Sequence, residues 1–180
     1  MIGVLWLRRE LLTRGIGTGG FIYLYVISDN SGLAGAIDSV AHGFPRGISS
    51  IEGLATLVAE LCSSGKKIRR LVIRGHGNGA GQLIGLDWLD INSLPKFTPA
   101  LSRIRQFLTA DCDVCLTGCN VGFAASLLAS LSTILGVKVK AYQDFQSPGS
   151  LRQGGESVCV RAACMTTVPS LTERVQDLLE

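Results

Sequence analysis

The stretch "IRRLVIRGHGNG", residues 68–79, is a β-favouring run with an apolar centre that ends in glycines around one histidine. Its first part, 68–75, is typical of a buried strand, and the glycines mark the loop that ends it. The segment that follows contains more glycines and shows no helical period. The histidine, His76, is therefore predicted to lie just past the carboxyl end of a strand.

A second predicted strand ends in the same way. In "DVCLTGCNVG", residues 113–122, the strand predicted over 112–118 leads to Cys119, immediately before a helix predicted over 121–135. Sequential strands are neighbours in most sheets, and ligands bind beyond the carboxyl ends of parallel strands. We therefore expect His76 and Cys119 to share one site.

The rest of the chain alternates strand and helix signals. Further strands are predicted from apolar or alternating runs at 21–29, 137–143 and 155–165. Further helices are predicted at 50–63, at about 98–109 after the Thr98-Pro99 start, and near the C-terminus after the capping-box pair Ser170 and Glu173. This alternation implies an α/β fold, a three-layer α/β/α sandwich with a mainly parallel sheet.

Length and composition limit the other possibilities. With 180 residues, 47% of them hydrophobic, the chain is predicted to form a single domain, 1–180. Its core is expected at 21–165, with an N-terminal extension at 1–20 and a C-terminal helix at 170–180. A net charge of +3 gives no indication of nucleic-acid binding, and no apolar run approaches the roughly 20 residues that cross a bilayer.

The N-terminal apolar run precedes its arginines, the reverse of a secretory signal, so we predict a cytoplasmic protein that binds no membrane. Six cysteines in such a chain indicate reduced thiols. Cys62, Cys159 and Cys164 are predicted to be structural, because each lies in a helix or strand pattern with no histidine beside it in sequence.

The pairing of a thiol with an imidazole suggests nucleophilic chemistry. A cysteine nucleophile needs a base or a positive local field, and His76 and the start of the predicted helix after Cys119 would supply both. The N–H groups of Gly77 and Cys119 would face a developing oxyanion, and Gly77 and Gly118 would let the backbone approach a substrate. Each residue alone is more often a turn or core residue, so the shared edge carries this hypothesis.

At these residues the sequence resembles the caspase-like (clan CD) cysteine peptidases, and "LVIRGHGNG" with "VCLTGCNVG" is especially similar to their bacterial relatives. The resemblance covers about 21–165. It implies a caspase-like fold, His76 as the catalytic histidine, Cys119 as the nucleophile, and the Gly77 and Cys119 N–H groups as the oxyanion hole. It implies a protein or peptide substrate and no cofactor, and leaves self-processing and homodimerisation open.

The resemblance also implies a pocket for the residue before the scissile bond. Its lining would come from Asp29 and Thr117, with Asp144 as a further contributor, and these carboxylates would favour a basic residue. The Gln-Ala-Cys-Gly pattern of caspases is absent, so specificity for aspartate is not implied. The family also implies a strand between the first strand and the first helix, for which "AIDSVAH", 36–42, is the available segment.

Three other interpretations remain as alternatives. A zinc site would use Cys112, Cys115, Cys119 and His76, but residues three apart in a strand point to opposite faces. A dinucleotide site would need a helix directly after the glycine loop, where no helical period exists. A third alternative is a catalytically inactive caspase-like module that only binds or interacts. His42, the other histidine, lies in an irregular connection and is a weaker candidate for the base.

Overall fold

The protein forms a mixed α/β fold around one mainly parallel sheet. The structure, a computed structural model, describes residues 20–28, 46–144, 157–161 and 164–168. Seven of the described strands form the main sheet, in the order β10, β9, β8, β7, β3, β1, β2. Their bounds are β1 Phe21–Ser28, β2 Arg46–Ile48, β3 Lys67–Arg74, β7 Leu108–Leu116, β8 Lys138–Tyr142, β9 Ser157–Arg161 and β10 Cys164–Val168. The predicted α/β class with a mainly parallel sheet is therefore confirmed.

In this sheet the neighbouring strands β2, β1, β3, β7 and β8 pair in parallel, whereas β9 pairs antiparallel with both β8 and β10. The segment predicted as one strand at 155–165 thus contains β9 and the first residues of β10, which pair antiparallel. The segment 36–42 lies outside the described residues, and the strand that pairs with the outer side of β1 is β2. The predicted helix at 170–180 and the extension at 1–20, apart from Gly20, also lie outside them.

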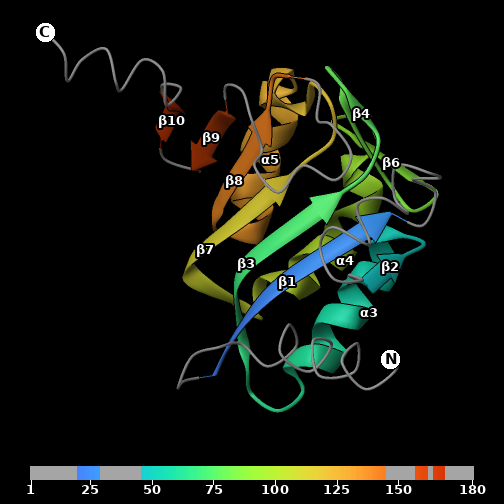
Figure 1. Cartoon of the computed structure of the whole chain (residues 1–180), viewed down its shortest axis with the longest axis vertical. Helices are drawn as coiled ribbons and strands as arrows, with labels where there is room; N and C mark the ends of the chain where they lie inside the picture. The colour runs from blue at the N-terminus through green and yellow to red at the C-terminus, as the bar shows by residue number, and fades with distance from the viewer. Residues whose placement is uncertain (1–19, 29–45, 145–156, 162–163, 169–180) are drawn as a thin grey trace, which may run out of the picture.

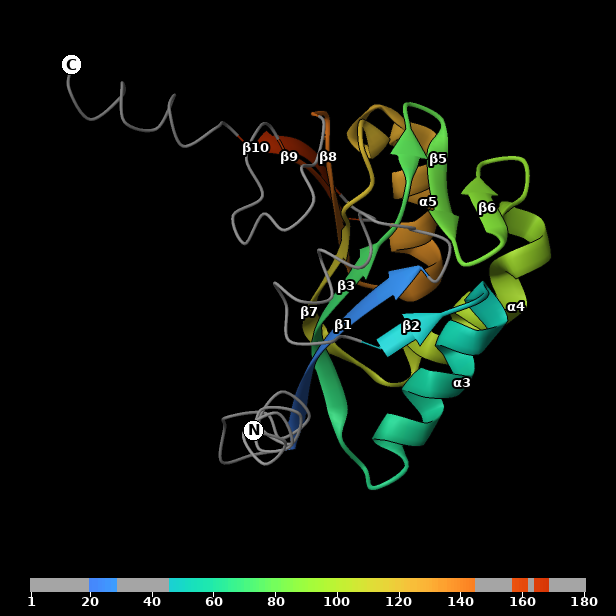
Figure 2. The same ribbon diagram turned by 45° about the vertical axis from the view of Figure 1, so that its right-hand side comes forward.

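Three described helices pack side by side on one face of this sheet (Figures 1 and 2). They are α3 Ile51–Cys62, α4 Leu94–Arg105 and α5 Ala125–Leu135. The chain advances from β1 to β3, β7 and β8 in one direction across the sheet, so right-handed crossovers place their helices on the same side. The described helices therefore give two layers, and none of them covers the other face. None is long and apolar enough to span a bilayer.

Helix α3 follows its sequence pattern. Its buried side includes Ile51, Leu54, Ala55 and Val58, an apolar stripe at helical spacing, and it ends at the buried Cys62. The Ser50 hydroxyl caps the helix by accepting a hydrogen bond of 2.9 Å from the N–H of the third helical residue. Local sequence and tertiary burial agree here, and the prediction for 50–63 is confirmed to within a residue at each end.

Helix α4 begins four residues before the predicted start at Thr98, and Pro99 lies inside it. Asp90 and Ser93 set this earlier start by bonding each other's backbone N–H, at 2.7 and 2.9 Å. The early turn also buries Leu94 and Phe97. Burial of these two side chains outweighs the backbone hydrogen bond that a proline inside a helix cannot make.

A second, smaller sheet follows β3 and was not predicted. It consists of the antiparallel strands β4 Gly77–Asn78, β5 Gly81–Ile84 and β6 Asp87–Asp90. It lies beyond the carboxyl ends of β1 and β3 (Figure 1). It is tied to the start of α3, because the Asp87 carboxylate accepts a hydrogen bond of 2.9 Å from the Ile51 N–H. The segment after His76 is therefore ordered structure rather than an open glycine loop.

Replacement of Gly85 with alanine will test this attachment. Gly85 has a φ of +63°, and an added Cβ would overlap the Ser49 carbonyl group. Gly65 is the matched control, because it has a φ of +80° but open space around it. We expect Gly65→Ala to lower the free energy of unfolding by about 1–2 kcal/mol through backbone strain. Gly85→Ala should lose about 1–3 kcal/mol more through the overlap. Equal losses in urea denaturation would contradict a tight contact at Gly85.

Candidate active site

The carboxyl ends of β3 and β7 lie next to each other, as the sequence predicted. The two strands pair in parallel, with Ile73 opposite Leu116. The last backbone hydrogen bond between them runs from the Thr117 N–H to the Ile73 carbonyl, at 3.0 Å. His76 and Cys119 follow within three residues of these strand ends. Both residues therefore leave the sheet at the same edge.

The glycines beside these two residues are in direct contact. A Cβ added at Gly77 would lie 3.0 Å from the Gly118 Cα, 3.0 Å from the Cys119 carbonyl oxygen and 2.5 Å from Cγ2 of the buried Val121. A Cβ added at Gly118 would lie 3.0 Å from the Gly77 Cα. These glycines were predicted to make room for a substrate backbone. In the structure they make room for each other and for the Val121 side chain, so the two backbones approach closely.

The backbone at His76 is held by the small sheet, while its side chain is exposed. The His76 carbonyl accepts a hydrogen bond of 2.7 Å from the Leu83 N–H. This bond lies one residue beyond the pair of Gly77 and Gln82. Because hydrogen-bonded and non-hydrogen-bonded pairs alternate in an antiparallel ladder, Gly77 and Gln82 form a non-hydrogen-bonded pair. The Gly77 N–H therefore points away from β5, a direction compatible with a role as a donor to a ligand.

Among the cysteines whose side chains the structure describes, Cys119 is the one that is partly exposed. The others are buried: Cys62, Cys112, Cys115 and Cys159. Burial raises the pKa of the Cys112 thiol to about 12, and the carboxylates of Asp113 and Asp111 add to this shift. Burial likewise raises the pKa of Cys62 and Cys115. Solvent access and ionisation thus disfavour these buried thiols as nucleophiles.

The segment after Cys119 differs from the prediction. The α-helix begins at Ala125 rather than at about 121, after a short 3₁₀ helix at Val121–Phe123. Asn120 makes the turn with a φ of 59°, in the left-handed region. Helix-dipole effects fade within the first turn, so the start of α5 is too far along the chain for the role assigned to it. Of the two sources of activation that the sequence suggested, the His76 side chain remains.

The three residues predicted to line a specificity pocket have different surroundings. Asp144 lies beside the loop that carries Cys119, because its carbonyl accepts a hydrogen bond of 3.1 Å from the Asn120 N–H. Asp144 is exposed to solvent. Thr117 is fully buried, and its hydroxyl donates to the Ile73 carbonyl at 3.3 Å, so it faces the interior. Asp29 lies outside the described residues. Asp144 therefore contacts the residue that directly follows Cys119.

Gln82 is a buried residue of this region that sequence reasoning missed. Its side chain is 0% exposed and forms two hydrogen bonds. Its Nε2 donates to the Ile73 carbonyl at 2.9 Å, and its Oε1 accepts from the Gly118 N–H at 2.8 Å. The only signal in the sequence was a polar residue within the β-like run "GQLIG", which is too short to indicate burial.

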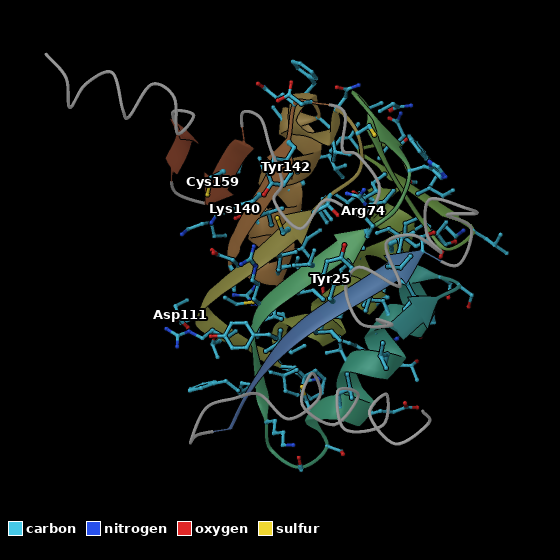
Figure 3. All side chains as sticks on the ribbon, viewed as in Figure 1. Tyr25, Arg74, Asp111, Lys140, Tyr142 and Cys159 are labelled. Atoms are coloured by element: carbon cyan, nitrogen blue, oxygen red, sulfur yellow. The ribbon has the colours of Figure 1, made fainter. Side chains whose placement is uncertain are left out.

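Arg74 was also missed. It is 7% exposed, and its Nη1 donates to the Thr117 carbonyl at 3.2 Å. Figure 3 shows it near the carboxyl end of β3. It therefore ties the same two strand ends together from the sheet face opposite the helices.

The alternative zinc site is not assembled. In β7, Cys112 belongs to the core that the helices cover, whereas the Cys115 thiol lies 4.0 Å from the Tyr142 hydroxyl. The prediction that these two cysteines point to opposite faces is confirmed. No group of three or more metal-ligating side chains occurs among the described residues.

The region that carries this geometry matches a protein family. Residues 46–159 match the family described as a domain of unknown function, DUF4347. The chain belongs to this family. The DUF4347 region runs from β2 into β9 and includes His76, Gln82 and Cys119, so the candidate site lies within it. No curated protein and no solved structure matches the chain.

Replacement of Gly77 with alanine will test the contact between the two loops of the DUF4347 domain. The new methyl group would collide with Val121 and the Cys119 backbone, and we expect a loss of about 1–3 kcal/mol in the free energy of unfolding. Gly79→Ala is the matched control, because its Cβ would make only an ordinary contact of 3.6 Å with Phe123. Urea denaturation measures both variants. If Gly77→Ala were no less stable than Gly79→Ala, the proposed close packing would be wrong.

Proposed function

We propose that the protein is a cysteine endopeptidase that cleaves peptide bonds through a His76–Cys119 dyad. The observation that carries the proposal is the contact between Gly77 and Gly118, each next to one member of the dyad. Because these backbones touch, the exposed imidazole of His76 and the partly exposed thiol of Cys119 are attached to neighbouring backbone segments at one edge of the sheet. Neighbouring backbone positions support the proposal, because base and nucleophile must come within hydrogen-bond reach of each other.

The strand order supports a caspase-like, three-layer fold. The parallel strands run β2, β1, β3, β7, β8, so the chain passes from β1 to one side and then returns to the other. This creates a topological switch point between β1 and β3, where α/β proteins commonly bind ligands. His76 follows β3 at this point, which is a further reason to assign it a role in the site.

The proposed reaction proceeds through an acyl-enzyme. The Cys119 sulfur attacks the peptide carbonyl carbon while its proton passes to His76, and the N–H groups of Gly77 and Cys119 stabilise the oxyanion. The C–N bond then breaks as His76 donates the proton to the leaving amine. Water attacks the thioester, gives a proton to His76 and releases the carboxylic acid, and the proton returns to the Cys119 sulfur. These steps use no cofactor, and the substrate would be a cytoplasmic protein or peptide.

Thiol labelling will test the dyad. We expect iodoacetamide at neutral pH to modify Cys119 faster than any other cysteine, with the modified residue identified by mass spectrometry. His76→Ala should slow this modification and reduce peptide cleavage by about 100-fold or more, because the thiol loses its base. His42→Ala is the matched control, since it removes the chain's other histidine. Even labelling of all exposed thiols, unaffected by His76→Ala and without cleavage of any peptide, would contradict the proposal.

Asp144 gives a separate prediction about specificity. Asp144 is exposed and its backbone carbonyl bonds the residue after Cys119, so we propose that its carboxylate favours Arg or Lys before the scissile bond. We expect Asp144→Asn to reduce this preference in kcat/KM by no more than about fivefold, because a solvent-exposed ion pair contributes about 1 kcal/mol at most. Asp111→Asn is the control, an exposed carboxylate in the first half of β7, away from Cys119. Peptides that differ only at this position measure the preference. An unchanged ratio for Asp144→Asn would exclude a role for this carboxylate.

A further inference from the structure

The buried amide of Gln82 joins three segments around the candidate site. Gln82 lies in β5, directly opposite Gly77 of β4. Its side chain reaches the Ile73 carbonyl near the end of β3 and the Gly118 N–H just before Cys119, at 2.9 and 2.8 Å. One residue therefore connects the strand before His76, the glycine after it and the residue before the thiol.

Core packing alone does not account for an amide at this position. Burying a side-chain amide is unfavourable unless its hydrogen-bonding groups are satisfied, and an apolar side chain of similar volume would fill the same space. Both ends of the Gln82 amide are bonded, and each partner lies within three residues of a member of the dyad. The amide therefore fixes backbone geometry that an apolar residue would leave unfixed.

The hydrogen bond to Gly118 has a particular consequence for the thiol. The N–H before Cys119 is held by Gln82, and the N–H after it, on Asn120, is held by the Asp144 carbonyl at 3.1 Å. Cys119 thus lies between two anchored peptide groups. Since the Gly118 N–H is already used, the donors assigned to the oxyanion remain those of Cys119 and Gly77.

We propose that Gln82 is a positioning residue for catalysis, holding Cys119 and its N–H at the distance and angle that the dyad needs. This inference rests on the proposed peptidase function. Gln82 is buried and touches no substrate, so it acts through the backbone on which Cys119 sits. Loss of its bonds should lower kcat and the reactivity of the thiol while leaving KM nearly unchanged.

Two variants separate positioning from mere stability. Gln82→Met keeps the approximate volume and removes both hydrogen bonds. We expect a drop of about 10- to 100-fold in kcat and in the rate of Cys119 alkylation, the range that small misplacements of a reacting group produce. The control is Ser132→Ala, which removes a buried hydroxyl that donates to the Val137 carbonyl at 2.7 Å. This bond lies just before β8 begins, at the end of the sheet opposite the candidate site. The control variant should lower stability without changing either rate.

Gln82→Glu adds a readout in pH. A protonated carboxyl can still donate to the Ile73 carbonyl and accept from the Gly118 N–H, whereas an ionised one can no longer donate. Burial raises the pKa of a carboxyl group. The alkylation rate of this variant relative to the wild type should therefore be highest at low pH and fall as the pH rises. The ratio cancels any titration common to both proteins.

The outcomes distinguish this inference from the proposed function. If alkylation of Cys119 in the wild type does not depend on His76, the peptidase proposal fails. If it does depend on His76 but Gln82→Met keeps the wild-type kcat and alkylation rate, the positioning role of Gln82 is overturned. Should Gln82→Met not fold, Gln82→Glu decides the question, because a ratio that does not change with pH would also overturn the inference.

Discussion

The contact between Gly77 and Gly118 is the constraint on which the arrangement of the site depends. Two backbones can meet at this distance only where neither carries a Cβ. The parallel pairing of β3 with β7 brings the strand ends together, and the glycines allow the loops beyond them to close onto each other. Without this contact, His76 and Cys119 would share an edge of the sheet but would not be held as neighbours.

The parts of the structure that could be predicted are those in which a local pattern and tertiary burial agree. The runs that became β1, β3 and β7 are apolar enough at their carboxyl ends to indicate burial on both faces, and parallel order follows from the intervening helices. The position of His76 and Cys119 at one edge follows from the same reasoning. Sequence thus indicated the residues of the candidate site, although not how the space between them is filled.

The failures have physical causes in particular residues. The small sheet was missed because Gly85 interrupts the strand pattern of "GQLIGLDWLD", residues 81–90, and because its stability comes from contacts with distant segments. The start of α4 was misplaced because Thr98-Pro99 is a stronger local signal than the Asp90–Ser93 pair. Gln82 and Arg74 are buried polar residues that donate hydrogen bonds to backbone carbonyls. No pattern of residue types in the sequence indicates such bonds.

The attachment of the small sheet also bears on how the domain folds. Its three strands pair within 77–90, so the strand pairing itself involves only nearby residues. Its anchors are remote: Gly85 bonds the Ser28 hydroxyl, 57 residues away, and Asp87 bonds the start of α3, 36 residues away. Contacts between distant residues form more slowly than local ones, because a long loop must close first. We therefore expect the segment carrying His76 to become stably ordered only when β1 and α3 are in place.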